Sequence, residues 1–151
     1  MNTCVFCKNL SGEMPASFVL RDRLVSAFLD IQPVHLGHVL VVPNQHAASL
    51  GEVPPPTLHA MMEAAAQLAQ VLRGEPLLCE GVNLFLADGE VAGQEVDHIH
   101  LHVIPRFAGD GFGLRFAAEY GTLPQRDDLD RVATVLREKL ARVRDIWTRA
   151  D

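Results

Sequence analysis

The chain has few cysteines, a minority of basic residues and no long apolar run. Its three cysteines in 151 residues are few and odd in number, which argues against a disulfide framework. No apolar run reaches the roughly 20 residues that a membrane span needs. The N-terminus also lacks the basic and apolar segments of a signal peptide. These absences predict a cytoplasmic protein in a reducing compartment.

Acidic residues outnumber basic ones. Thirteen Lys and Arg stand against nineteen Asp and Glu, which gives a net charge of −6. This charge argues against a groove for a nucleic acid polymer, although a small phosphate-bearing ligand could still be held locally. The length suits one domain. We therefore expect a single domain over 1–151, with its core at about 4–113 and a C-terminal helix at about 127–149.

The spacing of apolar residues predicts an α+β fold. Helical spacing between Leu58 and Leu72 indicates an amphipathic helix, in which Met61 and Met62 both face the core. Residues 1–16 are expected to form an irregular lead. Short apolar runs that indicate strands lie at 18–20, 25–29, 39–42 and 82–87. Strands, a helix, further strands and a last helix predict an antiparallel sheet with helices packed on it.

Three histidines at alternating positions are the most informative feature of the chain. His98, His100 and His102 alternate with aliphatic residues. Because successive side chains of a strand point to opposite faces, a strand here would place all three imidazoles on one face. A buried imidazole needs a hydrogen-bond partner, so such a row has little structural use. We interpret it as a functional site.

Cys4 and Cys7 form a Cys-x-x-Cys motif, which fits either a redox pair or half of a zinc site. Nothing nearby has the strand-then-helix context of a thioredoxin-like motif. Zinc is therefore favoured if histidines elsewhere complete a tetrahedron. Cys79 stands alone in an apolar context and is interpreted as core packing.

Several motifs in a fixed order together resemble one known family. They are the Cys-x-x-Cys, the segments 28–33 (FLDIQP) and 37–43 (GHVLVVP), Ala92-Gly93-Gln94, and 98–104 (HIHLHVI). This combination resembles the histidine triad (HIT) family of nucleotide-binding proteins. The resemblance implies a five-stranded antiparallel sheet with a central helix and a C-terminal helix. It also implies a homodimer that acts on a purine nucleotide, with adenine expected, and neither a nucleic acid polymer nor a membrane as a partner.

The resemblance implies a nucleotide hydrolase. Such an enzyme cleaves adenosine phosphoramidates or dinucleoside polyphosphates at the α-phosphate through a nucleotidyl-histidine intermediate. A nucleotidyltransferase with the same intermediate and a non-catalytic nucleotide-binding protein remain alternatives. A catalytic metal site on the three histidines is a further alternative, because His-x-His pairs can share one ion.

The catalytic roles follow from the resemblance. A neutral imidazole is a good nucleophile near pH 7, and its phosphoryl adduct stays reactive. His100 is implied to be that nucleophile, and His102 to donate a hydrogen bond to a non-bridging or leaving-group oxygen. Gln94 is implied to contact the phosphate or the leaving group.

The resemblance also implies the nucleotide-binding residues. Asp30 would accept hydrogen bonds from the ribose hydroxyls, and Gln94 and His102 would face the phosphate. His38 is interpreted as structural support. Candidates for an apolar base slot, each of which could equally be core, are Phe6, Phe28, Ile31 and Val41.

Members of the family with a Cys-x-x-Cys bind a structural zinc, and the implied ligands here are Cys4, Cys7, His46 and His98. Two thiolates and two imidazoles make a closed tetrahedral set with no open position. The ion would also fix the start of the histidine strand. A metal-free Cys-x-x-Cys is the alternative.

Departures from the family pattern bear on substrate preference. Ala87 stands where relatives usually carry a phosphate-gripping asparagine, and Glu95 stands where serine or threonine is common. A carboxylate beside an anionic phosphate is unfavourable unless it faces away or a cationic leaving group offsets it. Asp97 also replaces a more usual apolar residue or proline. Outside the pattern, His35 and His59 are interpreted as ordinary exposed histidines, while Arg106 could meet phosphate or cap the sheet.

Overall fold

The computed structural model describes residues 4–147. The chain forms two compact units, one that ends at Phe112 and one that begins at Gly113, and each is described by itself. The single domain expected over 1–151 stays a prediction. No helix among the described residues is long and apolar enough to cross a membrane.

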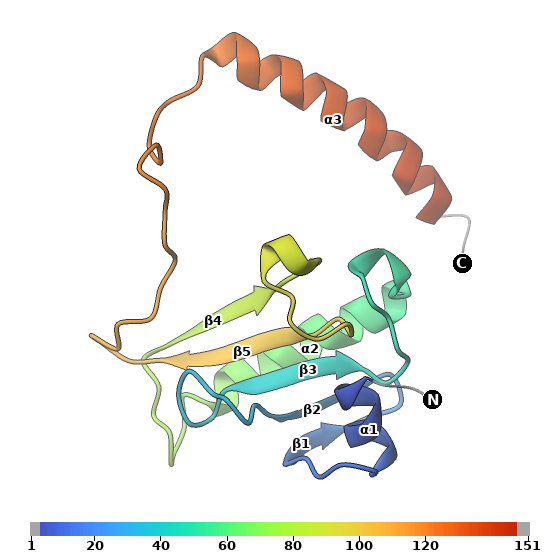
Figure 1. Cartoon of the computed structure of the whole chain (residues 1–151), viewed down its shortest axis with the longest axis vertical. Coiled ribbons are helices and arrows are strands. Elements are labelled where there is room, and N and C mark those ends of the chain that lie inside the picture. The colour runs from blue at the N-terminus through green and yellow to red at the C-terminus, as the bar shows by residue number, and fades with distance from the viewer. Residues whose placement is uncertain (1–3, 148–151) are drawn as a thin grey trace. The chain divides into compact units, whose positions relative to one another are not determined.

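The first unit is built on a five-stranded antiparallel sheet with the order β1-β2-β3-β5-β4 (Figure 1). The strands are β1 (Phe18–Arg21), β2 (Val25–Leu29), β3 (Val39–Pro43), β4 (Gly81–Leu86) and β5 (Leu101–Arg106). The helices of this unit are α1 (Val5–Ser11) and α2 (Pro55–Val71), with short 3-10 turns at Leu50–Glu52 and Glu90–Ala92. The predicted α+β class and the five-stranded sheet are confirmed.

One face of the sheet packs against α2 and forms the main core. Val39 and Val41 of β3 point to this side, and both are buried in a cluster that includes Met61 of α2. Cys79 is buried in the same cluster, as predicted. Met62 does not face the core, contrary to the prediction, and is 54% exposed. One residue step turns a helix by about 100°, so the neighbour of a buried position can point away.

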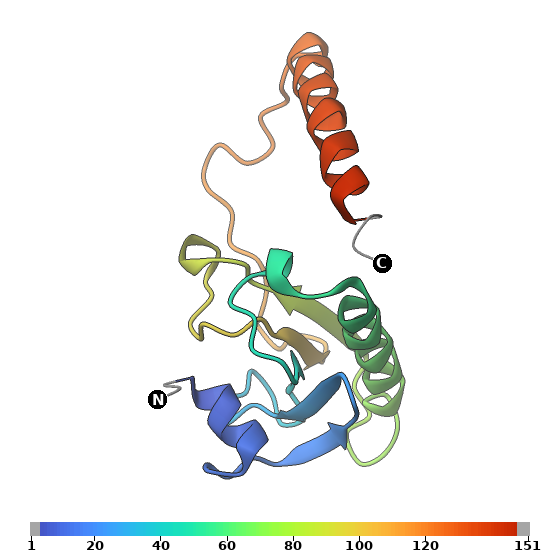
Figure 2. The ribbon, with the colours of Figure 1, turned by 90° about the vertical axis from the view of Figure 1, so that its right-hand side faces the viewer.

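The opposite face of the sheet, which we call the site face, carries a row of side chains across four strands. Leu40 of β3 pairs with Phe28 on one side and with His102 of β5 on the other. His102 in turn pairs with Phe85 of β4. Residues that pair across a sheet point to the same face, so the row runs Phe28, Leu40, His102, Phe85. Figure 2 shows α1 and α2 on opposite sides of the sheet.

Helix α1 corrects the expectation of an irregular lead over 1–16. Its seven residues end at Ser11, and the next residue, Gly12, has a φ of 83°, the left-handed conformation that glycine adopts readily. Phe6 packs edge-on against Phe28 of the site face, with ring centroids 5.4 Å apart. A helix this short is marginal in isolation. Tertiary packing of Phe6 therefore stabilises it, and local sequence does not reveal that packing.

The second unit contains α3 (Arg126–Trp147), close to the predicted helix at 127–149. Residues 148 and 149 lie outside the described residues. Asp127 and Asp128 occupy the first turn, where carboxylates interact favourably with the helix dipole. Apolar residues fall at helical spacing at Leu129, Val132, Leu136, Leu140 and Val143.

Candidate active site and metal centre

A cavity of about 570 Å³ lies over the site face, and two histidines of the triad line it. His100 and His102 lie on this cavity together with Asp30, which follows β2, and Phe6 of α1. The loop before β5 contributes Glu95. Apolar walls with a few converging polar groups are typical of a small-molecule site.

His100 is held as a neutral imidazole with a defined tautomer. It is 5% exposed, and its Nδ1 lies 2.7 Å from the backbone carbonyl of His98. A carbonyl oxygen can only accept, so Nδ1 carries the proton and Nε2 keeps its lone pair. Burial lowers the pKa of His100, while the bond to this carbonyl raises it to a smaller extent. The ring can therefore offer an unprotonated nitrogen near neutral pH.

His102 is held in the opposite tautomer through His38. The backbone N–H of Val34 donates to Nδ1 of His38 at 3.3 Å, so the proton of neutral His38 sits on Nε2. That Nε2 lies 2.9 Å from Nδ1 of His102 and donates to it. Nε2 of His102 therefore carries a proton. Burial, followed by the proximity of His100 and His38, lowers the pKa of His102 to about 4.

Asp30 lies close to His38. Oδ2 of Asp30 lies 3.5 Å from Nδ1 of His38, while Oδ1 accepts the backbone N–H of Gln32 at 2.9 Å. Burial lowers the pKa of His38, and the nearby Asp30 opposes that effect. His38, interpreted from the sequence only as structural support, thus orients His102, and neutral His38 has no proton on Nδ1 to donate to Asp30.

His98 faces a second site. Its Nε2 donates to the carbonyl of Pro43 at 3.0 Å, which leaves the lone pair on Nδ1. That nitrogen lies 3.5 Å from Sγ of Cys4 and 3.6 Å from Sγ of Cys7. Nδ1 of His46 lies 3.4 Å from Sγ of Cys7.

The ligand atoms of these four residues all lie within 4.8 Å of one another. Bonds of about 2.3 Å to sulfur and about 2.0 Å to nitrogen give tetrahedral edges of roughly 3.5 Å. The sulfur–nitrogen separations above match those edges. The cluster of Cys4, Cys7, His46 and His98 can therefore hold a metal ion.

The triad is not a continuous strand, which corrects one expectation. Only His102 lies within β5, because the chain bends at His98, whose N–H bonds the carbonyl of Val96 at 2.8 Å. His100 and His102 face the cavity, whereas His98 turns toward the cysteines. Among the groups of described residues that could share a metal ion, the three triad histidines do not appear together.

Gln94 lies beside the cavity but does not line it. Its Nε2 donates to the carbonyls of Ala48 at 2.9 Å and Val96 at 3.0 Å, and its Oε1 accepts the N–H of Gly89 at 2.7 Å. These bonds brace the loop before β5. That loop presents Glu95 to the cavity. The structure therefore does not bring the amide of Gln94 to His100.

The apolar candidates for a base slot divide between the two faces of the sheet. Phe6, Phe28 and Ile31 line the cavity. Val41 belongs to the core beside α2, so it cannot contribute to the slot. Ile31 is 91% exposed, so it lies at the open edge of the cavity.

Comparison with known proteins settles the family. The family model described as the HIT domain matches residues 11–109, which is well over half of the chain. The chain belongs to the HIT family. The HIT proteins similar to it include an uncharacterized HIT-like protein of Methanocaldococcus jannaschii, 43% identical over 113 residues, which are 75% of this chain and 86% of the relative.

Two further HIT proteins bear on function. The adenosine 5'-monophosphoramidase of Candida albicans is 34% identical over 145 residues and 93% of each chain. A crystal structure of a Zn-bound histidine triad family protein from Mycobacterium smegmatis superposes with a TM-score of 0.71 and 36% identity. It covers 95% of this chain and 97% of that one.

The motifs of the HIT family did not reveal part of the cavity wall. Val34, Phe85, Ile104 and Phe112 line the cavity. Strand alternation could have found Ile104, because it follows His102 by two residues and shares its face. Phe112 belongs to a loop, for which the sequence offers no such periodicity.

Proposed function

We propose that this HIT protein is a nucleotide hydrolase that releases AMP from adenosine phosphoramidates or dinucleoside polyphosphates. The observation that carries the proposal is the neutral His100, whose Nδ1–H is bonded to a carbonyl so that Nε2 is free to attack. The Candida albicans relative named as an adenosine 5'-monophosphoramidase supports the same reaction class.

The reaction proceeds in two steps. Nε2 of His100 forms a bond to the α-phosphorus, and the bond from phosphorus to the leaving group breaks. Water then attacks the phosphorus, which breaks the phosphorus–nitrogen bond and frees AMP. Overall, one water adds across the cleaved bond, so its hydroxyl ends on AMP and its proton on the departing group.

The neighbouring residues orient the nucleotide in this proposal. His102 donates its Nε2–H to a phosphoryl or leaving-group oxygen or nitrogen. Asp30 accepts hydrogen bonds from the ribose hydroxyls, and the adenine packs between Phe28 and Ile31. Gln94 can contact the phosphate only if its side-chain hydrogen bonds to the carbonyls of Ala48 and Val96 break. We therefore propose that its main role is to hold the loop before β5 in place.

We further propose that the metal of the cysteine cluster is zinc. The residues fit this ion because Cys4, Cys7, His46 and His98 supply two sulfurs and two nitrogens with tetrahedral spacing. A closed set without an open position gives the ion a structural role. Bound there, it would hold His98, whose carbonyl accepts the Nδ1–H of His100 and so orients that ring. A homodimer and a cytoplasmic location complete the proposal.

AMP release tests the proposed function. Wild type is incubated with adenosine 5'-phosphoramidate and with a diadenosine polyphosphate beside His100→Ala, and AMP is quantified by chromatography. Release by wild type and loss in His100→Ala are expected. His59→Ala is the matched control, because His59 is exposed on α2. Release that persists in His100→Ala refutes the nucleophile. Binding without release by wild type favours the non-catalytic alternative, and nucleotidyl transfer to a phosphate acceptor favours the transferase.

A further inference from the structure

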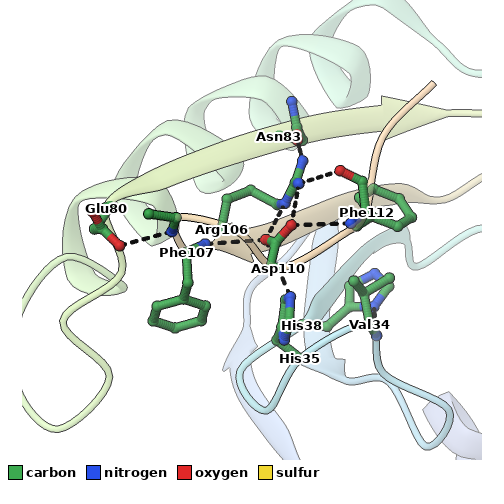
Figure 3. Close-up of polar contacts among 10 residues, drawn as sticks. Val34, His35, His38, Glu80, Asn83, Arg106, Phe107, Asp110 and Phe112 are labelled. Carbon is green, nitrogen blue, oxygen red and sulfur yellow. Dashed lines mark hydrogen bonds and ion pairs between the residues drawn. The ribbon is translucent and has the colours of Figure 1, made fainter.

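The loop that follows β5 closes on an ion pair at the end of the strand (Figure 3). Arg106 binds Asp110 through two nitrogens of its guanidinium, Nε to Oδ2 at 2.7 Å and Nη2 to Oδ1 at 2.6 Å. Asp110 also accepts the backbone N–H groups of Phe107 at 3.1 Å and Phe112 at 3.0 Å. Its side chain is only 4% exposed. Because a bidentate pair fixes geometry as well as adding energy, the carboxylate is held in place.

The ion pair is fastened to the edge strand of the sheet. Arg106 also donates to the side chain of Asn83 on β4, and the N–H of Ala108 donates to the carboxylate of Glu80 at 2.8 Å. The hydrogen bond from Arg106 holds the pKa of Asp110 well below its usual range, so the carboxylate stays charged near neutral pH. Neither member of the pair lines the cavity. The pair is therefore a fixed, charged support outside the cavity wall.

His35 corrects the expectation of an ordinary exposed histidine. Its Nε2 lies 3.2 Å from Oδ2 of Asp110, and its ring packs edge-on against Phe107 at 5.3 Å. This nitrogen is buried and makes no hydrogen bond of normal geometry with the described residues, so the charged carboxylate is the group that compensates for its burial. His35 thus joins the loop after β5 to residues 30–38, which connect β2 to β3 and which we call the β2–β3 turn.

The backbone of the β2–β3 turn is folded around His38. The N–H of Asp30 donates to the His38 carbonyl at 2.9 Å, and the N–H of His38 donates to the His35 carbonyl at 3.0 Å. The N–H of Val34 donates to Nδ1 of the His38 ring at 3.3 Å. His35 therefore lies at the backbone position that bonds His38 and adjoins Val34.

Two apolar side chains of this turn contribute little packing. Ile31 and Leu36 are largely exposed, and segments with few buried contacts open easily. Among the described residues, the other polar contacts of 31–37 stay within the turn. The polar contact of His35 with Asp110 therefore ties the middle of the turn to the loop after β5.

Two neighbours compete over the position of the His38 proton. The carboxylate of Asp30, 3.5 Å from Nδ1, favours a proton on that nitrogen, whereas the N–H of Val34 opposes it by donating there. While Val34 donates, Nε2 of His38 donates to Nδ1 of His102, whose own proton then sits on Nε2. With the proton on Nδ1 of His38, its Nε2 would accept instead, and the proton of His102 would move to Nδ1. The Val34 N–H thus decides which nitrogen of His102 can donate.

We propose that Asp110, acting through His35, positions the β2–β3 turn for catalysis. The contact keeps the Val34 N–H aimed at His38, and so keeps the proton of His102 on Nε2. Asp110 and His35 touch no substrate and are positioning residues. Their effect on catalysis rests on the proposed function, in which this proton is donated to the phosphoryl or leaving group, whereas their effect on the imidazoles can be measured without it.

NMR of ring nitrogens measures that effect directly. Protein labelled with ¹⁵N in histidine and loaded with zinc is studied at pH 8, where burial keeps His38 and His102 neutral. Wild type should show both rings protonated at Nε2. His35→Phe keeps a ring beside Phe107 but removes the nitrogen, and it should give the Nδ1–H tautomer of both rings in about 10% or more of the molecules.

Asp110→Asn is the second variant, because it keeps the shape of the side chain and removes its charge. It should produce the same tautomer change as His35→Phe. The matched controls are His59→Phe, at an exposed position of α2, and Asp127→Asn, in the second unit, and both should give the wild-type spectrum. A change of tautomer in the folded variants is a signature that a general loss of stability does not produce.

Nucleotide binding reports on the Asp30 end of the same turn. Calorimetry measures Kd for AMP and for 2',3'-dideoxy-AMP, which lacks the hydroxyls that Asp30 is proposed to bind. Wild type should prefer AMP, and His35→Phe should lower the ratio of the two affinities by about fivefold, as expected for a weakened hydrogen bond to a charged group. General loosening of the cavity would weaken both ligands and leave the ratio unchanged, so an unchanged ratio in His35→Phe counts against the positioning of Asp30.

The double variant tests whether the two residues act through one another. His35→Phe with Asp110→Asn should change the tautomers no more than the larger single change, and additive changes overturn the connection. Wild-type tautomers in either folded single variant overturn the proposal, whether or not wild type releases AMP. Equal binding of AMP and dideoxy-AMP by wild type refutes the ribose contact of the proposed function instead, and the NMR result then decides the inference.

Discussion

The neutral state of the half-buried His102 makes the stability of the first unit depend on pH. In wild type, Nε2 of His38 lies 2.9 Å from Nδ1 of His102. The variant His102→Gln removes the titrating ring, and its side-chain oxygen can still accept the hydrogen bond from His38. In the folded chain the pKa of His102 is lowered from 6.5 to about 4. Between these values the unfolded chain binds more protons than the folded one. The free energy of unfolding therefore falls as the pH drops from 6.5 toward 4.

The size of this effect follows from the two pKa values of His102. They differ by roughly 2.5, and each pKa unit corresponds to about 1.4 kcal/mol. The full loss is about 3 kcal/mol below pH 4, and about 2 kcal/mol is already lost at pH 5. Between pH 7 and pH 5, wild type should therefore lose about 2 kcal/mol more stability than His102→Gln.

Urea denaturation at a series of pH values measures this difference. Wild type, His102→Gln and His59→Gln are unfolded at half-unit steps from pH 7 to pH 5, in the presence of equal zinc. His59 is exposed on α2, so His59→Gln should follow wild type. If the difference in the free energy of unfolding between wild type and His102→Gln instead stays constant over this range, His102 is not held neutral by its surroundings. In that case the assignment of its proton to Nε2 fails as well.

Three further perturbations test other parts of the account. Cys4→Ser with Cys7→Ser should abolish bound zinc, measured by atomic absorption, and lower the melting temperature; full zinc content in the variant would contradict the ligand set. Asp30→Ala should raise KM for adenosine phosphoramidate more than it lowers kcat, and an unchanged KM would count against the ribose contact. Ile99→Ala should cost about 2–5 kcal/mol of stability in urea denaturation, because Ile99 is 0% exposed. The exposed Val91→Ala should change stability by less than about 0.5 kcal/mol, and comparable losses in both would refute the core assignment.

The strands and the central helix could be predicted because burial imposes periodicity on them. The continuous apolar run Val39–Val42 predicts a buried strand, and β3 occupies that position with all of its residues buried. The grouping of Cys4, Cys7, His46 and His98 could be inferred only from resemblance, because the members lie far apart in the chain. The structure brings their ligand atoms together.

The features that the sequence did not predict depend on tertiary contacts that leave no pattern in the sequence. Helix α1 forms because Phe6 packs on the sheet. The bend at His98 breaks the expected strand, since side-chain and backbone bonds there compete with pairing. The contact between His35 and Asp110 joins residues 75 positions apart. Propensity and spacing carry no information about such pairs.

The central claim is that His100 forms a covalent bond to the nucleotide. Rapid quenching of wild type with adenosine phosphoramidate labelled at the phosphorus, followed by alkaline peptide mapping, measures this directly. We expect label on the peptide that contains His100, stable in alkali and labile in acid, and none in His100→Ala. Turnover by wild type without labelled peptide at any quench time, or label that persists in His100→Ala, would contradict the claim.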